Sequence, residues 1–292
     1  MSQFPIYQIP QSAIDYDLEG TKGVVEKYWI DLPELGRCLF KLEEDGTNGA
    51  WVEKITSELA QAIGIPTAIY EFAQLPDGRN GILSPNYLQP NCRERSGKIY
   101  LDERFGTKKY LYTIENVLTT IDRLGLTLSN CSSLPSQIKS SSDLFAGYLL
   151  FDFLVDNCDR HFENWGIQID NLSGRKQLLP NYDNGLGLGF LLFEDELDSA
   201  DPASYVMNQA SSFQKSRGRS LPMVELLAET IAFKTVAAQA WSQQIAVIEP
   251  ELVTGLFQRI PAGWMSRSAQ FFAIELIDFN RQQIQSVCQQ FT

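Results

Sequence analysis

The sequence predicts an α+β fold of two lobes: a small β-rich N-terminal lobe over residues 1–84 and a larger, mainly helical lobe over residues 85–292. Three observations support this division. Short alternating segments bounded by turn residues fill most of the N-terminal part. Segments with an apolar period near 3.6 residues fill most of the rest. A chain of 292 residues with 44% hydrophobic residues can also bury a core large enough for two lobes that share a cleft.

The composition argues against several classes of function. The formal net charge is −12 and no run of Lys or Arg forms a stripe along which phosphates could bind, so we expect no nucleic-acid partner. The longest apolar stretch, residues 144–155, is interrupted by Asp152 and is too short to span a bilayer, so we expect no membrane partner. The five cysteines lack the spacing of a zinc site or a disulfide framework, which predicts a cytoplasmic location.

The N-terminal lobe is expected to begin with a hairpin followed by a helix. Residues 27–30 and 37–42 have the composition of strands, and residues 31–36 form the short turn segment between them. Residues 51–63 place their apolar side chains on one helical face, and Gly64 supplies a stop signal. The sequence therefore predicts two paired strands and then an amphipathic helix.

A second strand pair completes this lobe. Residues 67–72 and 81–83 are predicted strands on either side of a turn at residues 76–78. Residues 84–87 then break the pattern, because they contain Pro and Asn between longer apolar segments. We therefore place the boundary between the two lobes at this point of the sequence.

The C-terminal lobe is expected to consist mainly of helices, with one β interruption. The segments with a helical period are residues 114–123, 143–155, 223–241, 250–257 and 269–287. Ser140 and Asp143 have the spacing of a capping box and predict the start of the second of these helices. Residues 165–169 and 177–179 predict the single hairpin of this part.

Three polar side chains flank that hairpin and point to a specific chemistry. Asp159 and Asn164 precede it on a loop, and Asp183 follows it. Because a hairpin returns the chain to its starting end, Asn164 and Asp183 can approach each other. Phosphoryl transfer needs an acceptor hydroxyl held in line and cations that bridge the phosphates. Asp159 would then orient the hydroxyl, while Asn164 and Asp183 would supply oxygen ligands to Mg²⁺.

The spacing alone does not establish this site. An Asp followed five residues later by an Asn is expected about once by chance in such a chain, and Asp152 with Asn157 is a second instance. Asp152 lies inside a helical segment, so we expect it on the polar edge of that helix. For Asp159, Asn164 and Asp183 themselves, loop-capping and Asx-turn roles fit the pattern equally well.

Four short motifs occur in order along the chain. They are Phe40-Lys41, Glu53, Asn157-Cys-Asp159-Arg-His-Phe-Glu-Asn164 and Tyr182-Asp183. As a set they resemble the HipA-like serine/threonine kinases, whose protein-kinase-like fold is shared more distantly by the phosphatidylinositol kinases. The resemblance runs from about residue 20 to residue 183. It implies a two-lobed kinase fold with ATP and Mg²⁺ as cofactors.

By this resemblance, Lys41 holds the α and β phosphates of ATP and pairs with Glu53 on the neighbouring helix. The resemblance therefore implies three catalytic residues: Asp159, Lys41 and Glu53. The helical period alone does not choose between Glu53 and Glu58. Lys41 shares its strand face with Leu39, an apolar side chain that could cover the adenine.

Two connecting segments are expected to complete the nucleotide site. Residues 31–36, which end at Gly36, should cover the phosphates. The segment between the lobes should lie against the adenine and contact it mainly through backbone groups. Within that segment the expected contacts are Ser84, Asn86 and Tyr87.

The leading hypothesis is a kinase that transfers the γ-phosphate of ATP to a Ser or Thr of a protein substrate, because this is the activity of the HipA-like relatives. A small-molecule kinase with the same polar residues is an alternative, and so is a nucleotide-binding pseudokinase that acts as an interaction module. The resemblance also leaves open a regulatory protein partner. The only histidine, His161, is expected to steady the catalytic loop by hydrogen bonding.

Overall fold

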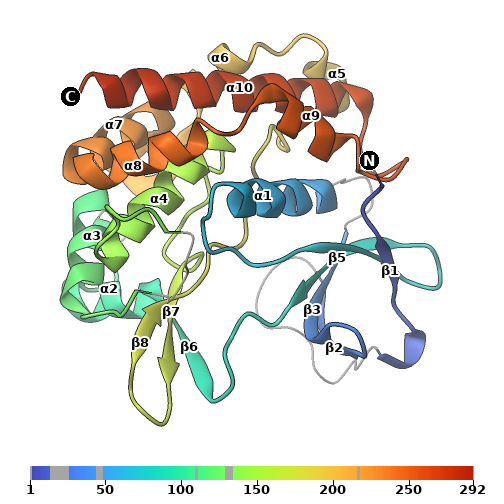
Figure 1. Cartoon of the computed structure of the whole chain (residues 1–292), viewed down its shortest axis with the longest axis horizontal. Coiled ribbons are helices and arrows are strands. Elements are labelled where there is room, and N and C mark those ends of the chain that lie inside the picture. The colour runs from blue at the N-terminus through green and yellow to red at the C-terminus, as the bar shows by residue number, and fades with distance from the viewer. Residues whose placement is uncertain are drawn as a thin grey trace.

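The computed structural model describes residues 2–13, 26–43, 49–108, 111–128, 134–215 and 218–291. In these ranges a five-stranded sheet and one helix form the N-terminal part, and most of the other helices gather on one side of them (Figure 1). Two smaller sheets accompany the helices. The expected α+β class, with a β-sheet lobe and a helical lobe, is confirmed.

The N-terminal sheet has the strand order β1, β4, β5, β3, β2. Its strands are β1 (Ile6–Gln8), β2 (Lys27–Leu32), β3 (Gly36–Leu42), β4 (Glu71–Gln74) and β5 (Asn80–Pro85). Neighbouring strands are antiparallel except for β1 and β4. In β3, Phe40 is fully buried on one face of the sheet, and Lys41 points to the opposite face because side chains alternate along a strand. Lys41 lies directly opposite Lys27 of β2 and Ile82 of β5.

Helix α1 (Ala50–Ala62) packs between this sheet and the C-terminal helices (Figure 1). It contacts β4 and β5 as well as α9 (Pro250–Phe257), where the rings of Trp51 and Phe257 lie 5.9 Å apart. Because neighbours cover several sides of the helix, even Glu53 is buried. One continuous apolar core extends through both lobes, which fixes α1 relative to the sheet and sets the direction of its side chains.

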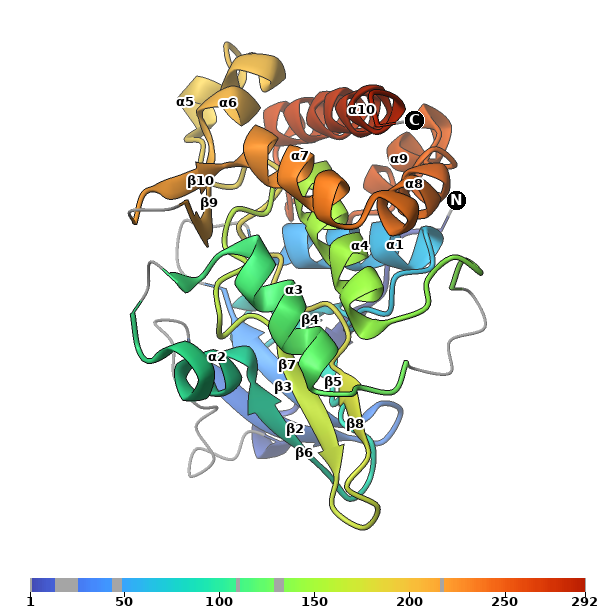
Figure 2. The ribbon, with the colours of Figure 1, turned by 90° about the vertical axis from the view of Figure 1, so that its left-hand side faces the viewer.

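The helical lobe is built around α4 (Ser141–Leu154), which lies among its neighbours in Figure 2. Its other helices are α2 (Gly97–Phe105), α3 (Ile114–Arg123), α5 (Glu194–Leu197), α6 (Pro202–Asn208), α7 (Met223–Phe233), α8 (Thr235–Ile245), α9 and α10 (Arg267–Gln289). Helix α4 is buried around almost its whole circumference and contacts α3, α7, α8 and α10, as expected for the centre of a large core. It begins with the predicted capping box between Ser140 and Asp143.

Two small sheets belong to this lobe. β6 (Cys92–Ser96), β7 (Gly166–Asp170) and β8 (Lys176–Leu178) form an antiparallel sheet, and β9 (Ala210–Gln214) pairs with β10 (Ser220–Pro222). The β7–β8 hairpin confirms the predicted one to within a residue at each end. The expectation of a single β interruption is wrong, because β6 and the β9–β10 pair add to it. None of the helices in the described ranges is long and apolar enough to cross a membrane.

Two other predicted elements differ from the structure. The strand predicted at residues 67–72 begins later, at Glu71, because the preceding segment forms backbone hydrogen bonds with Asn181 of the other lobe. The helix predicted over residues 223–241 is divided into α7 and α8 at Lys234, whose backbone is not helical. Apolar period cannot reveal such a break, since the buried positions continue on both sides of it.

Candidate active site

Three charged side chains from separate elements meet between the lobes. Nζ of Lys41, on β3, lies 2.8 Å from Oδ1 of Asp183 and 3.2 Å from Oε1 of Glu53 on α1. Asp183 follows the β7–β8 hairpin and has a φ of 60°, a left-handed conformation that is uncommon outside glycine. The expected pairing of Lys41 with Glu53 is present, whereas Glu58 pairs with Lys54 at 2.7 Å.

The charges of these three groups depend on one another. The cation of Lys41 lowers the pKa of Asp183 to about 2. Burial favours the neutral amine of Lys41, but the carboxylates of Asp183 and Glu53 outweigh that effect and raise its pKa. Burial raises the pKa of Glu53, and the ion pair with Lys41 opposes this shift. Lys41 and Asp183 are therefore both charged at neutral pH, ready to contact ions of opposite sign.

The loop between α4 and β7 carries the predicted catalytic aspartate. Asn164 donates from Nδ2 to the backbone carbonyl of Asp159 at 2.8 Å and to its Oδ2 at 3.3 Å. Nδ1 of His161 accepts a hydrogen bond from the amide of Glu163 at 3.1 Å, and its Nε2 lies 3.9 Å from Oδ2 of Asp159. The Asp159 side chain remains 35% exposed. The loop is thus held by its own side chains while one carboxylate stays accessible, which fits the steadying role expected for His161.

A buried arginine, Arg160, joins this loop to the segment that carries Asp183. Its Nε and Nη2 donate to the two carboxylate oxygens of Asp152 at 2.9 and 2.7 Å. Its Nη1 donates to the backbone carbonyls of Asn164 and Tyr182, both at 2.7 Å. Because both carbonyl oxygens bind the same nitrogen atom, the end of the loop and the turn at Asp183 lie side by side.

The expectation for Asp152 is wrong. Its side chain is 1% exposed, not at a polar helix edge, and it also accepts a hydrogen bond from Nδ2 of Asn157 at 3.1 Å. A buried carboxylate is tolerated when a cation and hydrogen bonds compensate the loss of water. The pair of Asp152 and Asn157 is therefore structural. The helical period could not reveal this, since Arg160 lies on the loop beyond the helix end.

A cavity of about 600 Å³ lies at this site, a volume in the range of small-molecule sites. Its lining includes Lys41, Glu53, Asp159 and Asp183. The structure thus brings the three predicted catalytic side chains and one predicted metal ligand to one cleft. Asn164 is not part of the lining, although it contacts Asp159 directly.

The residues predicted to contact adenine are Leu39 on β3, Ser84 on β5, and Asn86 and Tyr87 just beyond β5. Leu39 and Ser84 form a cross-strand pair on the cleft-facing side of the sheet. The amide of Asn86 donates to a carbonyl of β3 at 2.9 Å, so the connection stays attached to the sheet. Tyr87 stacks on Tyr182, with ring centroids 5.6 Å apart. The connection is therefore in contact with both lobes, but none of the four predicted residues lines the large cavity.

The geometry does not fit the expectation that residues 31–36 cover the phosphates. Gly36 pairs with Leu32 at the closed end of the β2–β3 hairpin, whereas Lys41 lies at its open end. Gly36 and Lys41 are five positions apart along the strand, a distance of about 16 Å. The tight turn at the closed end is too far from Lys41 to cover phosphates that Lys41 holds.

Two lining residues were missed by sequence reasoning. Lys27 lines the cleft directly opposite Lys41, whereas the predicted turn at residues 31–36 would pair residue 27 with residue 40 and turn Lys27 to the other face. Phe190 also lines the cleft. A Cβ at Gly49, the residue that precedes α1, would lie 3.0 Å from the ring of Phe190, so the segment after Asp183 touches the start of that helix. No local signal in the sequence predicts this contact.

Oxygen ligands suited to Mg²⁺ are present. Asp183 lines the cleft, and the hydrogen bonds that Asn164 donates to Asp159 use only its Nδ2, so its Oδ1 would be the atom that binds a metal. The part of the chain that the structure describes contains no cluster of three or more His, Cys, Asp or Glu side chains placed to hold a metal. Two protein ligands with phosphate and water oxygens for the rest is the usual arrangement of Mg²⁺ in nucleotide sites.

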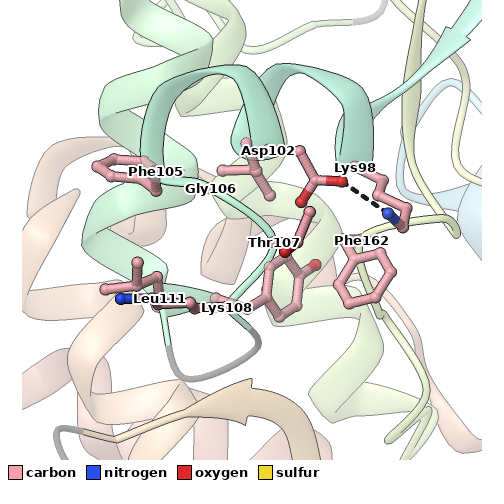
Figure 3. Close-up of a pocket in the computed structure, with 10 residues that line it drawn as sticks. Lys98, Asp102, Phe105, Gly106, Thr107, Lys108, Leu111 and Phe162 are labelled. Atoms are coloured by element: carbon pink, nitrogen blue, oxygen red, sulfur yellow. Dashed lines mark hydrogen bonds and ion pairs between the residues drawn. The ribbon is translucent and has the colours of Figure 1, made fainter.

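Two smaller hollows lie near the loop that carries Asp159. One, of about 170 Å³, lies beside α2, where Lys98 and Asp102 form an ion pair at 2.6 Å next to the ring of Phe162 (Figure 3). The other, of about 370 Å³, shares Phe162 with it and extends to Ser212. The hydroxyl of Ser212 donates to Oδ1 of Asp159 at 3.4 Å. Asp159 lines neither hollow, but the second one borders two of its neighbours, Ser212 and His161.

Comparison with known proteins identifies the fold. Neither the protein-family models nor the curated proteins contain a match to the sequence. Among solved structures, the chain is similar to the proinflammatory kinase CtkA of Helicobacter pylori, with a TM-score of 0.77, 14% identity and 98% of each chain covered. It is also similar to HipA of Shewanella oneidensis, solved with HipB and operator DNA, with a TM-score of 0.55, 13% identity, and 97% of this chain and 67% of that chain covered. The protein therefore has a HipA-like, protein-kinase-like fold.

A Golgi casein kinase with Mn/ADP bound is a third match, with a TM-score of 0.48, 9% identity, and 99% of this chain and 74% of that chain covered. All three solved structures are described as kinases or as HipA. The recognition of a HipA-like fold from the sequence motifs is confirmed by the first two.

Asp156, at the end of α4, is a buried acid with an unsatisfied oxygen. It is 2% exposed, and its Oδ1 has no hydrogen-bond partner among the described residues. Burial raises the pKa of this carboxyl from 3.8 to about 8. Its φ of 53° is also left-handed, a conformation that asparagine adopts more readily than most residues. The native residue is therefore unfavourable here in both its charge and its solvation.

We predict that breaking the buried ion pair destabilises the fold strongly. In Asp152→Asn, Arg160 keeps its charge but loses its counter-charge, so the free energy of unfolding should fall by about 3–5 kcal/mol. Arg160→Met should cost a similar amount, and the double variant should lose less than the two losses combined. Urea unfolding measures all three. The control is Arg79→Met, which removes the ion-pair partner of the exposed Asp77. The proposed role of the buried pair would be contradicted if the Asp152 and Arg160 variants lost no more unfolding free energy than this control.

We predict that Asp156→Asn stabilises the protein in a pH-dependent way. Below about pH 4 the wild-type carboxyl is protonated in both the folded and the unfolded chain. Between about pH 4 and pH 8 it ionises only in the unfolded chain, so the wild-type free energy of unfolding falls as pH rises. The asparagine side chain does not ionise, so the variant keeps the stability that the wild type loses as pH rises. At pH 8 the Tm of the variant should exceed that of the wild type by about 5 °C, with little difference at about pH 4.

The control for this experiment is Asp170→Asn. Backbone amides of Ser173 and Leu172 lower the pKa of this exposed carboxyl, so the substitution should lower stability above about pH 4 and have little effect below it. Thermal unfolding followed across pH measures both variants. A gain in Asp156→Asn that does not change with pH would show that the carboxyl is not buried as a neutral acid.

Proposed function

We propose that the protein is an ATP- and Mg²⁺-dependent kinase that phosphorylates Ser or Thr of a protein substrate. The observation that carries the proposal is the contact of Lys41 with Glu53 and Asp183 in a cavity that Asp159 also lines. Phosphoryl transfer requires a cation at the phosphates, a metal ligand and a group that orients the acceptor. The fold shared with solved kinases supports the same conclusion.

Each residue has a separate task in the proposed reaction. Lys41 donates to non-bridging phosphate oxygens and is positioned by Glu53. Asp183 and Asn164 hold Mg²⁺, which when bound neutralises charge on the phosphates. Asp159 accepts the hydrogen bond of the acceptor hydroxyl and aligns its oxygen with the γ-phosphorus. As the new O–P bond forms, the bond between the γ-phosphorus and the oxygen of ADP breaks, and the hydroxyl proton passes to Asp159.

The acceptor side of Asp159 favours a protein over a small molecule. The hollow of about 370 Å³ includes Ser212, which donates to Asp159, and is lined mainly by exposed or half-buried side chains such as Phe162 and Glu163. A small acceptor would be expected to bind in a site that buries most of its surface. An extended polypeptide can instead place one hydroxyl at Asp159 and keep its flanking residues along the surface.

We predict that three single substitutions remove phosphotransfer without unfolding the protein. Asp159→Asn should lower kcat by about 10²- to 10⁴-fold, because the acceptor hydroxyl loses its proton acceptor. Lys41→Met and Asp183→Asn should lower it at least as much, because they remove the phosphate cation and a metal ligand. Transfer from γ-labelled ATP to proteins of a lysate, and consumption of ATP, measure the effect.

The matched control is Asp77→Asn, an exposed aspartate in the turn between β4 and β5, which should keep wild-type activity. If ATP is consumed equally by the wild type, the control and the three variants, the activity belongs to a contaminant and the proposal fails. If the wild type binds nucleotide but transfers no phosphate, the remaining hypothesis is a pseudokinase that acts as an interaction module.

A further inference from the structure

The hollow of about 370 Å³ beside the catalytic loop lies next to the acceptor side of Asp159. Its lining residues are Tyr112, His161, Phe162, Glu163, Ser212 and Gln214. The hydroxyl of Ser212 donates to Oδ1 of Asp159 at 3.4 Å, and Nε2 of His161 lies 3.9 Å from its Oδ2. Under the proposed function, a polypeptide with its hydroxyl at Asp159 would therefore pass this hollow with residues that flank the acceptor.

Two aromatic rings form one part of the lining. The hydroxyl of the buried Tyr112 donates to the backbone carbonyl of Arg160 at 2.7 Å, and its ring stacks on Phe213 with the centroids 4.4 Å apart. The ring of Phe162 lies nearly perpendicular to that of Tyr112, with the centroids 5.7 Å apart and an angle of 89° between the planes. The face of an aromatic ring attracts a cation placed over it. The hollow thus presents an aromatic surface that the core holds in position.

Glu163 supplies the one carboxylate of the lining. Its backbone amide donates to Nδ1 of His161 at 3.1 Å, and its carbonyl accepts from the hydroxyl of Tyr182 at 3.0 Å. Its exposed carboxylate, in contrast, forms no hydrogen bond or ion pair with any residue that the structure describes. The neighbouring Lys98 pairs instead with Asp102 at 2.6 Å. The backbone of Glu163 is therefore held in place, while its charge is available to a cation from another molecule.

This lining fits one kind of side chain best. It contains no Lys or Arg, so its carboxylate would attract a cation and repel an acidic side chain. An apolar side chain in the hollow would remove water from Glu163 without supplying a hydrogen bond. The guanidinium of arginine can donate two parallel hydrogen bonds to a carboxylate and also stack on an aromatic ring, whereas the ammonium of lysine acts as a point charge. The combination of one carboxylate and two rings therefore favours arginine.

We propose that Glu163, with the rings of Tyr112 and Phe162, is a specificity site for an arginine of the protein substrate. The inference rests on the proposed function and adds to it the class of substrate, a basic segment that contains the phosphorylated Ser or Thr. An extended chain advances about 3.3 Å per residue, and Ser212 alone separates the hollow from Asp159, so the arginine should lie within about three residues of the acceptor. The net charge of −12 also favours the approach of a basic segment.

The test is an array of synthetic peptides with a single Ser or Thr, in which each flanking position in turn is Arg, Gln, Leu or Glu. With γ-labelled ATP and Mg²⁺, the kcat/KM of the wild type should be about 10-fold higher for Arg than for Gln at one flanking position, because the charge-assisted contact requires a cation. Glu163→Gln should abolish this preference, and Glu163→Arg should favour Glu at the same position. The matched control is Glu275→Gln, which removes an exposed carboxylate on α10 outside the hollow and should keep the preference of the wild type.

The ratio between two peptides separates a specificity residue from a structural one, because a distorted loop lowers the activity on every peptide equally. A wild type without a preference for Arg, an unchanged ratio in Glu163→Gln, or an equal loss of preference in Glu275→Gln would overturn the inference. If the wild type phosphorylates whole proteins but no peptide, the sites mapped in lysate proteins by mass spectrometry replace the array, and a lack of arginine around them would overturn it. If neither peptides nor proteins are phosphorylated, the proposed function fails instead.

Discussion

The buried ion pair between Arg160 and Asp152 is the constraint on which the geometry of the site depends. Removing two charges from water is unfavourable unless hydrogen bonds satisfy them. Asp152 accepts from Arg160 with both oxygens. The guanidinium also donates to the backbone carbonyls of Asn164 and Tyr182 and to the side-chain oxygens of Asn181 and Asn184. All of these hydrogen bonds can form at once only if the end of α4, the catalytic loop and the turn at Asp183 keep one arrangement relative to one another.

The same network continues into the N-terminal lobe through Asn184. Its side-chain Oδ1 accepts a hydrogen bond from Nη2 of Arg160 at 2.7 Å, and its backbone amide donates to Oε2 of Glu53 at 3.0 Å. Glu53 in turn pairs with Lys41, which contacts Asp183. One chain of polar contacts thus links the core helix α4 to the strand that carries Lys41. Under the proposed function, this connection would position the charged groups, and phosphoryl transfer depends mainly on placement and charge.

Most of the helices and strands could be predicted from the sequence, but few of the side-chain contacts that connect them could. Helical period and capping placed α3, α4 and α9 within a few residues, because those signals are local. Short strands such as β1 were missed, since three residues show no period and the partner strand is distant in sequence. Asp152 was misplaced for the same reason: a helical pattern separates polar from apolar edges but cannot show that a loop arginine covers a buried acid. The resemblance that predicts a phosphate-covering segment at residues 31–36 carries no strand register, and the observed register puts that segment at the closed end of the hairpin, away from Lys41.

The charge of the cleft explains why metal and nucleotide belong together under the proposed function. The charged lining residues are Lys27, Lys41, Glu43, Glu53, Asp159 and Asp183. With two cations against four carboxylates, a bare triphosphate would meet net repulsion from the very groups that should orient it. A divalent ion held by Asp183 would supply the positive charge that offsets this repulsion. Under the proposed function, the cleft would therefore favour the metal–nucleotide complex over either component alone.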